Sequence, residues 1–457
     1  MCDCGQCLSP TWRVPCPKGS GGSPGRPANK IDRNNSVGVG GHCRICNKSK
    51  AVGGLLVFLL VIVTTCAADG PKLHRRIRAS DSVSDSEQML YHNSIAEQFW
   101  TGNRSLRLNH LVYNHLANVL YVGGTNRLYE LDARNLDVRA AVETGPRFDS
   151  PKCHASGCGP ERGPDNRVTT HLTNNVNKVL VLDPSASTLI MCGSVSQGAC
   201  EKFRTANLSL TPEFIPRSVA ANDPTSSTFA FIGPEKYKPW GGSEALYVGT
   251  TFTTVGDYRH DVPAISTRNL YDLDYAELSF SKQSMIRIDV KYRDHFLVKY
   301  VYGFNATNFA YFMTVQKKSH LPGQEENGYI SRLARTCISD ANYDSYTEVT
   351  LECEGYDGTD YNLVQDAKLV TAGDDLAVSM GVNPGAHILV AVFATSEGHT
   401  AKNQKSSAVC AFAMRDVDAK FNENIHMCFN GSMQYRSMEY ISGPILNGKC
   451  PEAGVSK

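Results

Sequence analysis

The sequence predicts an all-β fold built from repeated sheets, the pattern of a β-propeller. After residue 106, short runs rich in β-branched and aromatic residues follow one another, each bounded by Gly, Asn, Asp or Pro. In addition, Leu120–Gly123 (LYVG) recurs as Leu246–Gly249, 126 residues later, with weaker echoes at Phe309–Val315 and His387–Phe393. A repeated β-unit of about 60 residues is typical of propeller blades with four strands and long loops.

A β-sandwich, or a set of small β-domains, is the alternative, because tyrosine-rich strands occur in both kinds of fold. The cysteines after residue 106 are spread too widely for small disulfide-stapled modules, and no Pro/Gly-rich linker divides the stretch from Leu106 to Cys450. Both observations favour the propeller.

The overall composition is that of a globular protein, with 457 residues, 41% hydrophobic and 20% charged. Of 46 Lys and Arg and 45 Asp and Glu, residues 1–50 hold eight basic and two acidic side chains, which leaves 38 basic and 43 acidic, a net charge of −5, for the rest. A nucleic-acid-binding main domain is therefore disfavoured.

Residues 1–50 are predicted to be a disordered or non-native basic extension. They contain Cys4-x-x-Cys7 and Cys43-x-x-Cys46, and paired CxxC motifs are the usual mark of a tetrahedral zinc site. The interval between the pairs is Gly/Pro/Ser-rich, has no helix or strand period, and exceeds the usual spacing of about 15–20 residues. We therefore expect no metal there, with zinc as the alternative.

Residues 51–68 are predicted to be a signal sequence and residues 69–105 a polar linker. Ala51–Cys66 carries no charge, follows a basic flank and leads into small residues, as signal sequences do. A signal anchor of type II orientation has a similar pattern and stays open as an alternative. Either interpretation places the chain in the secretory pathway, as an extracellular or plasma-membrane ectodomain.

The remaining stretch, residues 106–457, begins with a series of predicted strands: His110–Tyr113, Val119–Val122, Arg127–Leu131, Val179–Leu182 and Thr188–Met191. The last two form a hairpin, because Asp183-Pro184-Ser185 supplies turn residues between them. Cys192 and Cys200 flank the short interval GSVSQGA, so that they can close a tight loop after the second strand in an oxidising compartment.

Several motifs, in order, closely resemble the sema domain of plexins, the cell-surface receptors for semaphorins. They are NHLVYNHLANVLYVGGTNRLYELD at Asn109–Asp132, NNVNKVLVLD at Asn174–Asp183, CGSVSQGAC at Cys192–Cys200, YISRLARTC at Tyr329–Cys337 and YNLVQDA at Tyr361–Ala367. The resemblance implies a sema-type β-propeller over residues 106–457. The family's propeller has seven blades and this stretch supplies roughly five to six, so we expect it to be incomplete at the C-terminus. The ending leaves the subclass open, an invertebrate plexin included.

Nine cysteines follow the signal sequence. The resemblance implies four disulfides: Cys153–Cys158, Cys192–Cys200, Cys353–Cys410 and Cys428–Cys450. It also implies that Cys337 bonds a cysteine beyond Cys450, so that Cys337 is expected to be unpaired by truncation, with an intermolecular bridge as the alternative. A metal site is not expected among these cysteines, since no His/Cys cluster has ligand spacing.

Four sequons after the signal sequence are predicted to be N-glycosylation sites: Asn103, Asn207, Asn305 and Asn430. The sequence has no GxSxG elbow, P-loop, HExxH or kinase motif. We therefore expect neither an enzyme nor a cofactor. An extracytoplasmic propeller enzyme such as a glycosidase or lyase is the alternative, but it requires paired acids at comparable positions of successive repeats, and none are found.

The resemblance implies the ligand-binding head of a plexin-like receptor, which binds the sema domain of a semaphorin in axon guidance and cell-migration signalling. Plexins are attached to the plasma membrane through a segment that is absent from this sequence, so a secreted decoy or a non-functional truncated isoform is the alternative. By resemblance, the semaphorin-facing surface lies on blades three and four, with Leu270–Met285 as the candidate segment. Tyr275 and Phe280 stand there beside acidic residues, as an aromatic anchor with a polar rim. A core-facing Phe280 is equally compatible with the sequence.

Overall fold

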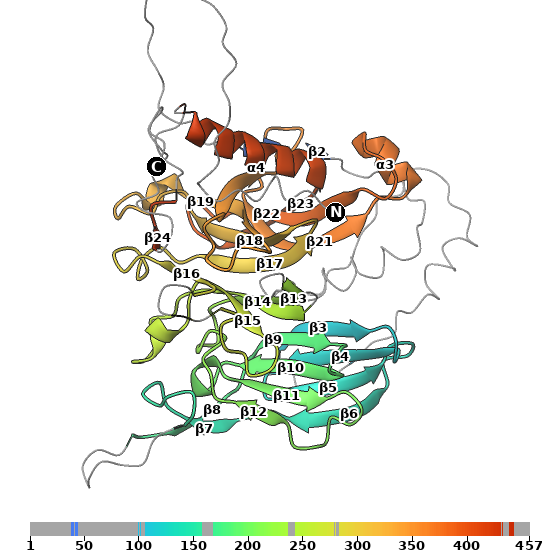
Figure 1. Ribbon diagram of the computed structural model, residues 1–457, viewed down its shortest axis with the longest axis vertical. Coiled ribbons are helices and arrows are strands. Elements are labelled where there is room, and N and C mark those ends of the chain that lie inside the picture. The colour runs from blue at the N-terminus through green and yellow to red at the C-terminus, as the bar shows by residue number, and fades with distance from the viewer. Residues whose placement is uncertain are drawn as a thin grey trace, which may run out of the picture. The chain divides into compact units, whose positions relative to one another are not determined.

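The computed structural model of the chain describes residues 38–40, 42–43, 99, 101, 106–157, 168–235, 243–277, 279, 283–430, 432 and 438–442. The chain divides into two compact units, one formed by Cys46–Pro224 and the other by Met1–Ile45 together with Thr225–Lys457. We call them the Cys46–Pro224 unit and the Thr225–Lys457 unit. Each consists mainly of antiparallel sheets (Figure 1).

The Cys46–Pro224 unit contains two four-stranded sheets and a two-stranded ribbon. The first sheet consists of β3 (Leu108–Asn114), β4 (Val119–Gly124), β5 (Arg127–Asp132) and β6 (Val138–Glu143). The second consists of β9 (Asn177–Asp183), β10 (Thr188–Gly193), β11 (Cys200–Arg204) and β12 (Glu213–Ile215), with the 3-10 turn η1 (Ser196–Gly198) before β11. The ribbon pairs β7 (Arg147–Asp149) with β8 (His171–Thr173). All five strands predicted here are present, and the predicted β9–β10 hairpin is confirmed.

The Thr225–Lys457 unit contains three sheets. One consists of β13 (Thr228–Glu235), β14 (Ser243–Thr250), β15 (Ile265–Asn269) and β16 (Met285–Ile288), with β24 (Ile441–Ser442) paired to β16. The next consists of β17 (Lys299–Ala306), β18 (Phe309–Lys317), β19 (Tyr329–Cys337) and β20 (Thr347–Glu352). The third consists of β21 (Leu363–Thr371), β22 (His387–Ser396) and β23 (Asn403–Ala413). The connecting segments hold η2 (Arg259–Asp261), η3 (Glu325–Asn327), α3 (Asp374–Met380) and α4 (Met414–Phe429).

The sequence repeat marks one strand position in successive sheets. The four echoes lie in β4, β14, β18 and β22, each of which pairs with the strand directly before it and the strand directly after it in the chain. One residue of each echo is fully enclosed: Tyr121, Tyr247, Tyr311 and Leu389 are all buried. The interval between the first two echoes spans two sheets, so each sheet is one blade, and the repeated β-unit predicted from the sequence is confirmed.

Little of the N-terminal region belongs to the described residues. Within residues 1–50, β1 (Gly38–Gly40) pairs in parallel with β20, and β2 (His42–Cys43) pairs antiparallel with β23. The remainder of this predicted extension, the predicted signal sequence and the predicted linker apart from Phe99 and Thr101 lie outside the described residues.

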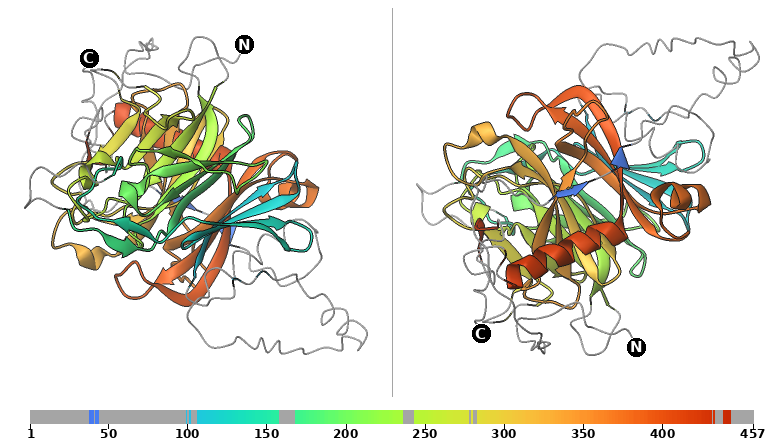
Figure 2. Two further views of the ribbon diagram at one scale, coloured as in Figure 1. Left: turned by 90° about the horizontal axis from the view of Figure 1, so that it is seen from below. Right: turned by 90° about the horizontal axis from the view of Figure 1, so that it is seen from above.

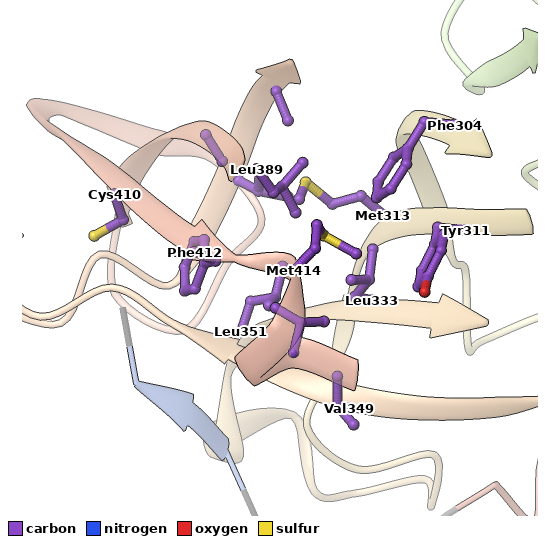
Figure 3. Packing of buried hydrophobic residues seen from close by; sticks show 14 of the residues in the cluster. Phe304, Tyr311, Met313, Leu333, Val349, Leu351, Leu389, Cys410, Phe412 and Met414 are labelled. Carbon is purple, nitrogen blue, oxygen red and sulfur yellow. The ribbon is translucent and has the colours of Figure 1, made fainter. Parts of the chain in front are cut away.

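Helix α4 is an element that the sequence interpretation missed. Its buried residues Met414, Val417 and Phe421 follow one another at intervals of three and four, which is the period of a helix with one apolar face. The helix packs against β20, β22 and β23 (Figure 1 and Figure 2). Figure 3 shows Met414 among core residues of these sheets, including Leu351 and Phe412. The core therefore continues from the sheets onto the helix.

Candidate functional site

The candidate segment Leu270–Met285 connects β15 to β16. The side-chain Oδ1 of Asn269 accepts hydrogen bonds from the backbone N of Tyr271 at 2.9 Å and of Asp272 at 3.0 Å, which forms a tight turn. Leu273 follows with φ +58° and a fully buried side chain, so that it fastens this turn to the unit. The beginning of the connection is therefore a fixed surface feature.

Tyr275, predicted to be an aromatic anchor, is half-buried and already has partners in its own unit. The guanidinium carbon of Arg268 lies 4.7 Å from its ring centre, and its hydroxyl donates to the backbone O of Asp261 at 3.4 Å. Phe280, the second predicted anchor, lies outside the described residues. Tyr271, which the sequence interpretation did not single out, is 84% exposed and presents the larger accessible aromatic surface.

A cluster of cationic and aromatic side chains lies on the β14–β15 connection, on β16 and on the segment that follows β16. The backbone O of His260 accepts a hydrogen bond from Arg287. The ring Nδ1 of His260 lies 2.8 Å from Nη1 of Arg293. The ring of Phe252 stacks on His260 with centres 5.7 Å apart, and the Arg293 guanidinium carbon lies 5.5 Å from the Phe252 centre. Burial, followed by the charges of Arg259 and Arg293, lowers the pKa of His260. The cluster holds in place the β14–β15 connection, residues 251–264, which we call the His260 loop. The sequence signal for the cluster was the mixture of aromatic residues with Arg and His in these segments.

The predicted glycosylation sites that the structure describes are all exposed. These are Asn207, Asn305 and Asn430, whereas Asn103 lies outside the described residues. The Oδ1 atoms of Asn207 and Asn430 each accept a hydrogen bond at 2.9 Å from the backbone N two residues on, so both sequons lie in turns. Asn305 lies near the end of β17, next to the turn into β18.

The structure contains two of the four implied disulfides, Cys192–Cys200 with an S–S distance of 2.05 Å and Cys353–Cys410 with 2.13 Å. Cys153 and Cys428 are also disulfide-bonded. Their predicted partners, Cys158 and Cys450, lie outside the described residues.

The expectation that Cys337 is unpaired is wrong, because it too is disulfide-bonded in the structure. That expectation rested on the family pattern, in which Cys337 bonds a cysteine beyond Cys450. Cys337 is buried at the end of β19.

The asparagine motif NNVNK joins the two sheets of the Cys46–Pro224 unit. Asn126 donates its backbone N–H to the O of Asn175 at 2.8 Å and accepts from the N of Asn175 at 2.7 Å. Asn175 also donates to the O of Thr144 at 2.8 Å, and Asn177 Oδ1 lies 2.7 Å from Nδ1 of His110. The motif therefore links the two sheets by hydrogen bonds at a junction between blades.

The YNLVQDA motif has the same role in the Thr225–Lys457 unit. The Oγ of Ser331 donates to the O of Asn362 and accepts from the N of Val364, both at 2.8 Å. Asn362 donates in turn to the O of Tyr329 at 3.0 Å. Both motifs thus supply polar contacts that hold one sheet against the next.

In the part of the chain that the structure describes, no group of three or more His, Cys, Asp or Glu side chains is arranged to hold a metal ion. No helix there is long and apolar enough to span a membrane.

The blades and their junctions define the class of the protein: it is an all-β, sema-type β-propeller. The Sema domain family model matches residues 364–456. A solved structure of the Plexin A4 full extracellular region matches with a TM-score of 0.63 and 29% sequence identity, over 76% of this chain and 38% of that chain.

Within this class the chain is homologous to the plexins. Human Plexin-A2 is 30% identical over 350 residues and human Plexin-A4 is 32% identical over 343 residues, which is 73% and 71% of this chain. The chain spans 18% and 17% of the lengths of these relatives.

Proposed function

We propose that this chain is the ligand-binding extracellular head of a plexin-like cell-surface receptor and that its ligand is the sema domain of a semaphorin. The observation that carries the proposal is homology to plexins over 73% of the chain, together with the match to the extracellular region of Plexin A4. The role is that of a binding protein without catalytic activity, located outside the cell or in the secretory pathway.

The scaffold suits such a role because rigid sheets hold the connecting loops in fixed positions. On the sheet β13–β16, Tyr271 provides an exposed aromatic ring and the His260 loop provides an exposed polar edge. Aromatic anchors within a polar rim are the usual centre of a protein interface. We assign the β15–β16 connection and the His260 loop as the contact surface, with Tyr271 in place of Tyr275 as its main anchor.

Binding of the secreted chain to purified semaphorin sema domains, measured in a biosensor, tests the proposal. The variant Tyr271→Arg is expected to lose at least tenfold in affinity, because it places a charge where an aromatic contact is needed. Val378→Arg is the matched control, since Val378 is 82% exposed and lies on α3, in the connection between β21 and β22. Equal affinity of both variants would contradict the assigned surface, and absence of binding to any semaphorin would contradict the proposed function.

A further inference from the structure

Tyr356 lies at the tip of a tight turn between β20 and β21. The N of Gly355 donates to the O of Thr359 at 2.8 Å, and the N of Gly358 donates to the O of Gly355 at 3.0 Å. Gly358 has φ +79°, a conformation that glycine adopts without strain. The backbone closes this turn without help from the tyrosine side chain, which is 77% exposed.

The charged side chains next to Tyr356 in the sequence are all acidic. Glu352, Glu354, Asp357 and Asp360 are all exposed, and none of them forms an ion pair with a described residue. Hydrogen bonds from Thr359 lower the pKa of Asp357, which keeps its carboxylate ionised. No Lys or Arg occurs between Arg335 and Lys368. The charged residues that flank the phenol along the chain are therefore all acidic.

The other tyrosines of this basic-free segment, residues 336–367, are not accessible in the same way. Tyr343 and Tyr346 are buried, and their hydroxyls lie within hydrogen-bond distance of Thr267 and Glu348 respectively. Tyr361 is half-buried. Within these residues, all of which the structure describes, Tyr356 alone combines an exposed hydroxyl with acidic residues on both sides.

We propose that Tyr356 is a tyrosine O-sulfation site. This inference rests on the proposed passage through the secretory pathway, where tyrosine sulfotransferases act on exposed tyrosines with acidic neighbours. In the transfer, the bond between sulfur and the bridging oxygen of a phosphosulfate donor breaks, and a bond between that sulfur and the phenol oxygen forms. The phenol proton passes to a base of the transferase, and the adenosine bisphosphate leaves with the bridging oxygen.

The modification changes the chemistry of the turn without changing its fold. It adds a permanent negative charge at the tip, beside four carboxylates. Because the phenol hydroxyl takes no part in closing the turn, the sulfate projects into solvent. The modified turn presents a strongly anionic group suited to a cationic partner surface.

Mass spectrometry of the full chain secreted from cultured animal cells tests the inference. The peptide containing Tyr356 is expected to carry the mass of one SO₃ group, resistant to phosphatase and lost when chlorate blocks synthesis of the donor. Tyr356→Phe should remove the sulfate from the protein, while Tyr271→Phe, the matched exposed tyrosine with Arg268 three residues before it, should retain it. Glu354→Gln combined with Asp357→Asn should lower the modified fraction severalfold.

The same peptide map separates this inference from the proposed function. An unmodified Tyr356 in material that carries N-glycans at Asn207, Asn305 or Asn430 would overturn the sulfation site and leave the extracellular assignment intact. Absence of glycans at all three would overturn the extracellular assignment on which the inference rests. Incubation of the purified chain with tyrosine sulfotransferase and donor provides an independent arm, in which failure to modify Tyr356 also counts against the site.

Discussion

The β10–β11 hairpin and the helix α4 are stabilised by different kinds of contact. In the hairpin, Cys192 and Cys200 stand opposite each other on paired strands and are joined covalently at a sequence separation of 8. The polar contacts of α4 instead centre on Arg335 of β19, whose partners on the helix are 83 and 87 residues away. One region is thus closed by a local bond and the other by distant side chains.

The Arg335 site shows how a buried charge can hold a helix. Its guanidinium donates to Asp418 at 3.0 Å and to Asn422 at 3.1 Å, and its carbon lies 4.1 Å and 4.4 Å from the ring centres of Phe309 and Phe421. The charge is paired, hydrogen-bonded and enclosed by aromatic faces, which offsets the cost of its burial. A similar buried site in the same unit joins Glu348 of β20 to Tyr440, which immediately precedes β24.

The largest effect is expected from Glu348→Ala. Glu348 is buried, accepts hydrogen bonds from Tyr346 and Tyr440, and lies 3.5 Å from Arg332. Its removal leaves the half-buried Arg332 without its ion-pair partner and two buried hydroxyls without their acceptor, so the free energy of unfolding should fall by about 3–5 kcal/mol. Urea unfolding measures this. Glu352→Ala, an exposed position on the same strand, is the control and should change stability by less than about 0.5 kcal/mol.

Arg335→Met should lower the free energy of unfolding by about 2–4 kcal/mol, because Asp418 loses its ion pair while part of its carboxylate stays hydrated. The loss should be concentrated in α4, so limited proteolysis should cut within Met414–Phe429 before it cuts the sheets. Arg415→Met, at an exposed position of the same helix, should leave the cleavage rate unchanged. Equal protection of α4 in both variants would mean that apolar packing alone holds the helix.

Removal of the local bond by Cys192→Ser with Cys200→Ser should cost less, about 2–3 kcal/mol, since the closed loop is short. The hairpin itself should persist, because its strands are also paired to β9 and β12. Hydrogen exchange of the β10 amides tests this: protection close to that of the unchanged protein is expected. Complete loss of protection would show that the covalent bond, and not the sheet, organises this region.

The smallest effect concerns Lys178 of the NNVNK motif, whose pKa burial lowers to about 8 from 10.5 while the charge of Asp223 opposes the shift. Between these two pH values the unfolded chain binds more protons than the folded chain, so stability should rise with pH. Lys178→Met should therefore stabilise the protein by about 1–2 kcal/mol at pH 7 after allowance for screening, and the difference should shrink as the pH rises above 8. Lys291→Met, at an exposed lysine, should show no such pH dependence in thermal unfolding curves.

The same difference between local and distant contacts explains which elements could be predicted from the sequence. The β9–β10 hairpin followed from residues close together in the chain, namely two apolar runs and the turn at Asp183-Pro184-Ser185. The strand repeat was equally visible because each blade repeats the same local pattern. Helix α4 was missed because it follows β23 without a break. Its apolar residues, including Val417 and Phe421, were therefore not recognised as a new segment with a helical period.

The proposed contact surface followed from the sequence only in part. The segment Leu270–Met285 was chosen for its mixture of aromatic and acidic residues, but which tyrosine is exposed depends on packing. Arg268 and Asp261 engage Tyr275, while Tyr271 is left accessible, and both contacts come from the preceding strand and loop. The bonded state of Cys337 likewise depends on a partner that no local pattern identifies.

The most direct test of the central claim is competition for a semaphorin. The secreted chain is expected to bind at least one semaphorin sema domain saturably, and the extracellular region of human Plexin-A4 should displace it, because homologous heads use overlapping surfaces. Folding must be verified on the same material through the Cys192–Cys200 and Cys353–Cys410 bonds. A correctly bonded chain that binds no semaphorin, or that binds one without competition from the relative, would contradict the account.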